Sequence, residues 1–250
     1  MGCSTSSGPS VKMATPIQRL SRLASRTFSR LNTGEGLSND MLLQLKSRFN
    51  EITADDVCFD ARHIQERDRL THEKAPVSYI HMWEDDCFSM GIFVVKRGGQ
   101  LPLHDHPGMF GLLKVIYGTL KIVSFSEVSG VDVPEEISQL FPRRQRPLLK
   151  PVKLQQDGLI TSYDMCCQLT PSEGNFHEIS SESDMAAFVD ILAPPYNHSR
   201  DRDCNYYKLV PTDDKEPNRH IEWLVRVSQP TEFWCDTVDY QGPDLEIENN

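Results

Sequence analysis

The stretch Leu101-Pro-Leu-His-Asp-His-Pro-Gly-Met-Phe110 carries two histidines separated by one residue, His104 and His106. Side chains at positions i and i+2 of an extended strand point to the same face of a sheet. The two imidazoles would then converge on one point, as a mononuclear metal site requires. Gly98-Gly99 before the stretch and Pro107-Gly108 after it favour a strand that ends in a turn. The alternative is a pair of exposed loop histidines.

Short runs rich in β-branched and aromatic residues continue on both sides of this stretch, with turn residues between them. Many short strands without intervening helices indicate a sandwich or barrel. The runs are Val77 to Trp83, Phe88 to Val95, Leu112 to Tyr117, Thr119 to Phe125, Tyr163 to Leu169, Ala186 to Leu192, Tyr206 to Val210 and Ile221 to Val227. Residues 127–160, with several prolines and arginines, are expected to form a long polar insertion.

Four segments are expected along the 250 residues. Residues 1–36 form a flexible basic leader, and residues 37–75 form a helical segment packed on the barrel. Residues 76–236 form the β-rich domain, and residues 237–250 form a loose acidic tail. The net charge of −10 argues against a nucleic-acid partner. No apolar run is long enough for a transmembrane segment.

The first residues carry two weak targeting signals. Met1-Gly2-Cys3 fits a myristoylation pattern with a cysteine available for palmitoylation. Residues 16–31 carry arginines and an apolar helical face, as a mitochondrial transit peptide does. A flexible basic leader on a cytoplasmic protein is the simpler interpretation. The seven cysteines are odd in number and form no CxxC pair, so free thiols in a reducing compartment are expected.

The spacing from Gly98 through His104 and His106 to Gly118 resembles the first motif of the cupin superfamily, with one substitution. The fourth ligand position, usually Glu, holds Gly111. A second cupin-like motif runs from Pro171 to His177 and offers a third histidine. The resemblance implies an all-β fold, the cupin double-stranded β-helix or jelly-roll barrel, with short N-terminal helices in front.

Longer motifs resemble the cysteamine dioxygenase and plant cysteine oxidase family from about Pro76 to Trp234. They are His104 to Met109, Leu113 to Gly118, Asp190 to Tyr196 and Arg202 to Tyr207. The resemblance implies that residues 76–236 are a cupin thiol dioxygenase domain. It implies a monomeric enzyme that uses Fe(2+) and O2 to convert cysteamine, or the N-terminal cysteine of a protein, into a sulfinic acid. Because O2 is a substrate, a role in oxygen sensing is a further expectation.

The resemblance assigns His104, His106 and His177 as the metal ligands. Three neutral imidazoles leave an iron(II) ion its full charge, whereas a carboxylate ligand would cancel part of it. Such a centre attracts an anionic thiolate and lowers the pKa of a bound thiol. Sulfur supplies the electrons for O2 reduction, which is consistent with a chain that has no nucleotide or flavin motif.

Four other residues are candidates for the site. Asp190 lies in an apolar run and either orients the substrate's ammonium near the iron or forms a structural salt bridge. Tyr196 either lines the pocket mouth or packs in the fold. Cys204 and Tyr206 are two residues apart, hence on one strand face. The resemblance implies that they can form a thioether crosslink; without it they would be core residues. Asp105 points away from its flanking histidines on a regular strand and is expected to be structural.

Two other functions fit the same residues. A zinc hydrolase or isomerase would also use three histidines and an open position, with Asp190 as its general base. A cupin-like binding protein with a vestigial metal site would not be an enzyme. Metal analysis and O2 uptake distinguish the zinc enzyme from a dioxygenase. In a binding protein with a vestigial site, replacement of His104 would leave the behaviour unchanged.

Overall fold

A computed structural model describes residues 13–245 of the protein, apart from residues 33, 35, 72–73 and 212–220. The helices are α1 (Pro16–Asn32), α2 (Asn39–Asn50), η1 (Asp55–Val57), α3 (Ala61–Leu70), α4 (Glu135–Gln139), η2 (Arg146–Leu148) and η3 (His198–Arg200). The strands are β1 (Val77–Glu84), β2 (Ser89–Lys96), β3 (Gln100–His104), β4 (Phe110–Tyr117), β5 (Thr119–Glu127), β6 (Leu149–Thr161), β7 (Cys167–Leu169), β8 (Phe176–Ser181), β9 (Met185–Ala193), β10 (Tyr206–Leu209), β11 (Glu222–Val227) and β12 (Cys235–Thr237).

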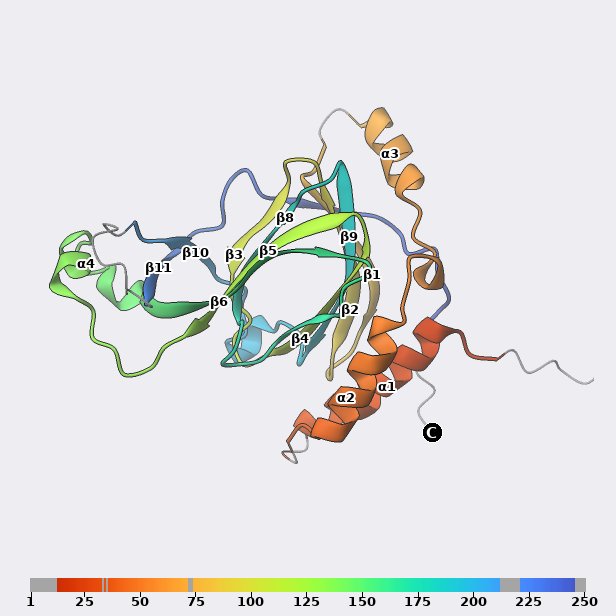
Figure 1. Ribbon diagram of the computed structural model, residues 1–250, viewed down its shortest axis with the longest axis horizontal. Helices are drawn as coiled ribbons and strands as arrows, with labels where there is room; N and C mark the ends of the chain where they lie inside the picture. The colour runs from red at the N-terminus through yellow and green to blue at the C-terminus, as the bar shows by residue number, and fades with distance from the viewer. Residues whose placement is uncertain (1–12, 33, 35, 72–73, 212–220, 246–250) are drawn as a thin grey trace, which may run out of the picture.

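The strands form two groups of six. One is an open sheet in the order β12-β1-β2-β9-β4-β7, and the other closes on itself in the order β10-β11-β6-β5-β8-β3. The second group closes where β10 pairs with β3, at the register Tyr206 to His104. Figure 1 shows the strands surrounding a common interior, with the N-terminal helices outside. The prediction of an all-β cupin-type barrel preceded by short helices is confirmed.

Strand alternation in β9 separates the helix-packed side of the open sheet from the interior. Val189 and Ile191 pack in one cluster with the apolar residues of α1 and α2. Phe188 packs instead with residues of β5 and β8, in the interior. Because alternate side chains of a strand share a face, Asp190 belongs to the interior side with Phe188. The sequence pattern therefore directs one carboxylate into the barrel.

The expectation of a flexible leader over residues 1–36 is wrong for residues 16–32, which form α1. Ile17, Leu20, Ala24 and Phe28 recur at helical spacing, and each is at most 1% exposed. Arginines and serines occupy much of the remainder of the helix, so its composition resembles that of an unstructured leader. Cleavage after α1 would expose the core that it covers, which argues against a transit peptide of that length. Residues 1–12, with the lipidation pattern, lie outside the described residues.

The expectation of a loose acidic tail over residues 237–250 is also wrong for its described part. The backbone N–H of Val238 donates to the Tyr79 carbonyl at 2.9 Å, which extends the parallel pairing of β12 with β1. Leu245 is buried, and the Gln18 side chain donates to the Asp244 carbonyl at 2.8 Å. A few apolar residues between the acidic ones anchor the segment. Residues 246–250 are outside the described part.

The expected polar insertion at residues 127–160 contains a long strand. β6 pairs with β5 from Thr161 to Val152 and with β11 at its other end. Several β6 side chains are exposed, so the strand lacks the apolar alternation that would identify it.

Among the cysteines that the structure describes, none is joined to another by a disulfide. Among the described residues, no helix has the length and apolar character needed to cross a membrane.

Candidate metal centre

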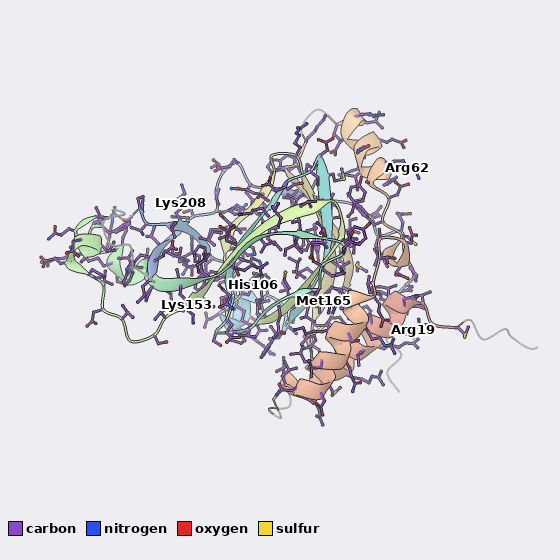
Figure 2. All side chains as sticks on the ribbon, in the orientation of Figure 1. Arg19, Arg62, His106, Lys153, Met165 and Lys208 are labelled. Atoms are coloured by element: carbon purple, nitrogen blue, oxygen red, sulfur yellow. The ribbon has the colours of Figure 1, made fainter. Side chains whose placement is uncertain are left out.

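Three histidine rings meet inside the barrel (Figure 2 labels His106). Their centroids are 4.7 to 4.8 Å apart in every pair, and one nitrogen of each lies within 4.8 Å of those of the others. His104 is the last residue of β3 and pairs across the ladder with His177 of β8. His106 follows in the turn after β3. All three side chains are buried. The structure therefore brings together the three predicted metal ligands.

The strand argument for the histidine pair is only half right, because β3 ends at His104. His106 is held in its turn by Asn175. The amide oxygen of Asn175 accepts from the His106 backbone N–H at 3.1 Å, and its amide nitrogen donates to the His106 carbonyl at 2.8 Å. Convergence of the two rings thus depends on a turn fixed by a residue 69 positions away. Strand spacing alone does not produce it.

Hydrogen bonds set the ring orientation of two of the histidines. The Nδ1 atom of His104 lies 2.8 Å from the Pro102 carbonyl oxygen, which can only accept. The Tyr196 hydroxyl donates to the Asp105 carbonyl at 2.8 Å, so it accepts from His106 Nδ1 at 2.8 Å. Both rings therefore carry their proton on Nδ1 and present an unprotonated Nε2. Partners of this kind fix the tautomer of metal-binding histidines.

Burial keeps the three imidazoles neutral. It lowers the pKa of His104, although the Pro102 carbonyl and Asp105 partly oppose it. It holds the pKa of His106 and of His177 well below the usual value, and the neighbouring imidazoles lower both further. Neutral imidazole is the form that binds a metal ion. The site is therefore in its ligating state at neutral pH.

The donor set fits a transition-metal ion. The Nε2 atoms of His106 and His177 are 3.1 Å apart, so the pair either shares one proton or binds one cation. Two nitrogens at right angles around one ion, each about 2.1 Å from it, lie about 3.0 Å apart. Imidazole ligands suit iron, zinc, copper and nickel, and they do not suit calcium or magnesium. These three residues could hold such an ion through nitrogen alone.

The fourth position of the cupin pattern, Gly111, has no room for a carboxylate ligand. A Cβ atom added there would lie 2.8 Å from Cγ of Leu169 and 3.0 Å from Cδ2 of Leu192. The absence of the usual glutamate is therefore built into the packing around β4.

A cavity of about 230 Å³ adjoins the three imidazoles. Phe93, Phe188 and Phe233 form part of its wall, with the first two rings stacked at 5.3 Å. Asp190 is the one acidic side chain among the described residues that line it. Burial raises the pKa of the Asp190 carboxyl to about 7. The cavity can thus accept a small, partly apolar molecule and present a carboxyl group to its polar end.

The other candidate residues also line this cavity. Tyr206 begins β10 next to His104, with their ring centroids 6.5 Å apart. Cys204 precedes the strand, so the expectation that both residues lie on one strand is not met. Burial raises the pKa of the Tyr206 hydroxyl, and the neighbouring Cys204 raises it further. Burial raises the pKa of Cys204 to about 11, which keeps the thiol protonated at neutral pH. Tyr196, also at the wall, contacts His106 through its hydroxyl.

Asp105 lies outside the cavity and joins the histidine turn to β10. Its Oδ1 accepts from the Asn205 backbone N–H and side-chain amide, both at 3.0 Å. Its Oδ2 accepts from the Tyr207 hydroxyl at 2.7 Å. The carboxylate therefore has a structural role beside the site.

Sequence reasoning misses several residues of the site. Phe233 and Cys235 reach the cavity from a segment outside the cupin motifs, and no local pattern indicates this. Asn175 offers a signal, because it lies in the second motif two residues before His177. Phe93 and Phe188 are identifiable from the sequence only as strand residues.

Comparison with known proteins places the chain among characterised relatives. The family model PCO_ADO matches residues 48–245. The 2-aminoethanethiol dioxygenase of Mus musculus is 37% identical over 94% of this chain and 98% of its own length. Plant cysteine oxidase 1 of Arabidopsis thaliana is 29% identical over 93% of this chain and 81% of its own. A cupin superfamily protein of Desulfitobacterium hafniense, known as a solved structure, is 11% identical with a TM-score of 0.32, covering 51% of this chain and 87% of that one.

Proposed function

The chain belongs to the PCO_ADO family, and on this basis we propose that it is an iron(II)-dependent thiol dioxygenase. Its substrates would be cysteamine or the N-terminal cysteine of a protein, together with O2, and its product a sulfinic acid. The names of its relatives, 2-aminoethanethiol dioxygenase and plant cysteine oxidase, support this substrate class.

The carboxylate-free set of three buried imidazoles is the observation that carries the proposal. His104, His106 and His177 would hold the iron, and the hydrogen bonds to Pro102 and Tyr196 hold two of the rings in the ligating tautomer. Bound iron(II) would supply redox chemistry toward a thiolate and O2. The protein's part is to keep the ligands neutral, so that the charge of the ion attracts the thiolate. Proximity of sulfur and O2 in one cavity then contributes to the rate.

Asp190 supports a preference for thiols that carry an amine. A charge pair at 4 Å has a Coulomb energy of about 4 kcal/mol at an effective dielectric of about 20, and desolvation removes much of it. A residual of about 1.4 kcal/mol still gives a tenfold preference. Since burial raises the Asp190 pKa to about 7, an arriving ammonium would also favour loss of its proton. Cysteamine and a peptide's N-terminal cysteine present the amine without a neighbouring carboxylate, and free cysteine does not.

Cys204 and Tyr206 are proposed as the thioether pair that the family resemblance implies. The placement of the two residues supports it, because both line the cavity and Tyr206 pairs with His104 across the ladder. Formation of the thioether joins the Cys204 sulfur to a ring carbon of Tyr206 and breaks one S–H and one C–H bond; the two electrons and two protons pass to O2, which becomes hydrogen peroxide. Intact-mass measurement before and after turnover detects the loss of two hydrogen atoms, and Cys204→Ser provides the matched control.

The decisive experiment is anaerobic loading of the purified protein with iron(II), followed by measurement of O2 consumption. Cysteamine, a cysteine-initiated peptide and free cysteine are compared as substrates. We expect the product of the first two to gain two oxygen atoms, both traceable to labelled O2. A zinc-only protein without O2 uptake would instead support a hydrolase or isomerase. Full activity of His177→Ala would contradict the ligand assignment.

An oxygen-sensing role follows only if the rate depends on oxygen within the cellular range. Measurement of KM for O2 tests this directly. A KM far below cellular oxygen would contradict a sensing role and leave the dioxygenase assignment intact.

A further inference from the structure

A second, much smaller cavity lies behind the metal centre. Its volume is about 20 Å³, against about 230 Å³ for the front cavity, the one that adjoins the three imidazoles. His177 and Asp190 line both cavities, so these two side chains lie between them. We call the smaller one the rear cavity; its other lining residues include Gly111, Leu113, Ile122, Cys167 and Leu169.

The volume of the rear cavity limits which molecules it can hold. A cavity needs roughly 10–15 Å³ on this scale to hold one water molecule. The rear cavity therefore has room for a single water-sized or diatomic molecule and excludes an aminothiol. Leu113, Ile122 and Leu169 are at most 6% exposed and give it an apolar inner wall. Ser124, Gln156, His177 and Asp190 add hydrogen-bonding groups to other parts of the wall, so the apolar side is the part that suits O2.

The outer end of the rear cavity lies between β6 and β7. Gln156 is half-buried there, and Gln168 is exposed. The Gln156 side chain makes a long contact of 3.9 Å to the Cys167 sulfur, and Gln168 accepts a hydrogen bond from Lys46 at 2.8 Å. These residues do not line the front cavity. The rear cavity thus reaches toward the surface by its own path.

Gly111 occupies a tightly packed part of the rear-cavity wall. It lines the rear cavity at the position where the cupin pattern usually has a glutamate. A Cβ atom there would lie within 3.0 Å of Leu169 and Leu192, so any side chain would have to displace them. The glycine that replaces the fourth ligand therefore lets Leu169 and Leu192 pack against the backbone beside the rear cavity.

We propose that the rear cavity is the access route for O2, separate from the front cavity through which the thiol enters. The inference rests on the proposed dioxygenase function, since it assigns a path to that function's second substrate. A separate route for O2 has a physical advantage. A bound thiol, above all the N-terminus of a protein, fills the front cavity, and a second route lets O2 reach the site without displacing it.

Dissolved O2 itself provides a test that needs no turnover. O2 is paramagnetic and broadens the NMR signals of methyl groups near the positions it occupies. In the metal-free protein, we expect O2 to broaden the methyl signals of Leu113, Ile122 and Leu169. The buried core methyls of Leu20 and Leu45 provide the baseline. If the rear-cavity methyls are broadened no more than this baseline, the proposal is wrong.

Matched substitutions test the route in the iron-loaded enzyme. Cys167→Met narrows the rear cavity, and Cys235→Met makes the same exchange at the wall of the front cavity. We expect Cys167→Met to lower kcat/KM for O2 about tenfold, equivalent to about 1.4 kcal/mol on the barrier. Its KM for the thiol should stay unchanged. Cys235→Met should show the opposite pattern, a raised KM for the thiol with kcat/KM for O2 retained.

Cys167→Ala removes the same thiol without filling the space, so it should keep the wild-type kcat/KM for O2. An O2 effect confined to Cys235→Met would show that O2 uses the front cavity and would overturn the proposal. Wild-type protein that consumes no O2 with any thiol would overturn the proposed function instead. If Cys167→Met does not fold, the NMR measurement on the wild type still decides.

Discussion

Replacement of Asp105 should weaken the protein at the point where the histidine turn is attached to β10. Its carboxylate accepts hydrogen bonds from the backbone N–H and the side-chain amide of Asn205 and from the Tyr207 hydroxyl. Asp105 and Tyr207 are 7% and 5% exposed. Water therefore has little access to replace a lost partner. The cost of a substitution depends on which donors it leaves without an acceptor.

The magnitude follows from these contacts. Asp105→Ala leaves the Tyr207 hydroxyl and the Asn205 donors without their acceptor, which should cost about 3–5 kcal/mol of unfolding free energy. Asp105→Asn keeps an oxygen for Asn205, and the Tyr207 hydroxyl can rotate to accept from the new amide. It should cost about 1–2 kcal/mol. Tyr207→Phe alone loses one hydrogen bond and should also cost about 1–2 kcal/mol.

The double variant gives the sharpest test. Asp105→Ala combined with Tyr207→Phe no longer contains the hydroxyl that lost its acceptor. The double variant should therefore lose less unfolding free energy than the two single variants added together, by at least about 1 kcal/mol. Urea denaturation of the metal-free proteins, with equal m-values, measures all four free energies. Strict additivity, or Asp105→Ala within about 0.5 kcal/mol of the wild type, would show that this carboxylate does not hold the turn.

Three further outcomes are expected. Phe28→Ala, at a fully buried position of α1, should lower the unfolding free energy by about 3–5 kcal/mol, and an unchanged denaturation midpoint would contradict the packing of α1 on the domain. Tyr196→Phe removes the acceptor of His106 Nδ1 and should weaken metal affinity about 10–100-fold with the fold retained, as isothermal titration measures. Burial raises the Asp190 pKa to about 7, so the carboxyl stabilises the metal-free fold most below the unfolded-state pKa of 3.8 and this contribution is lost as the pH rises through 7. The stability of Asp190→Asn relative to wild type should therefore grow by about 3 kcal/mol between pH 5 and pH 8, and pH-independent differences in denaturation would refute the raised pKa.

The sequence predicts the parts of the site that follow local spacing. His104 and His106 lie in one motif with cupin spacing and His177 in a second that differs from it by one residue, so the family resemblance is what identifies the candidate ligand set. Asp190 is identifiable because a carboxylate interrupts an apolar strand. Strand alternation then directs it inward, where the structure finds it.

Other features depend on contacts between distant segments, which local patterns do not encode. Asn175 fixes the turn of His106, and Phe233 and Cys235 complete the cavity from near the end of the chain. The composition of α1 indicates a leader, whereas its periodicity indicates a packed helix. Its apolar residues recur every three or four positions, which is the better signal. β6 escapes prediction because a strand with one exposed face and few apolar residues resembles a loop.

The closure of the barrel and the metal centre occupy the same place, and this links stability to function. β3 and β10 share a single register pair, Tyr206 to His104, so the backbone ladder alone holds this seam weakly. The Asp105 cluster adds the Asn205 and Tyr207 contacts across the same seam, one residue beyond a metal ligand. A bound ion would add a further link, because His104 on β3 and His177 on β8 would share it with His106 in the turn. Ligand binding to the native state raises stability by RT ln(1 + [L]/Kd). Loosening of Asp105 should therefore reduce metal affinity as well as stability, and metal should restore part of the loss.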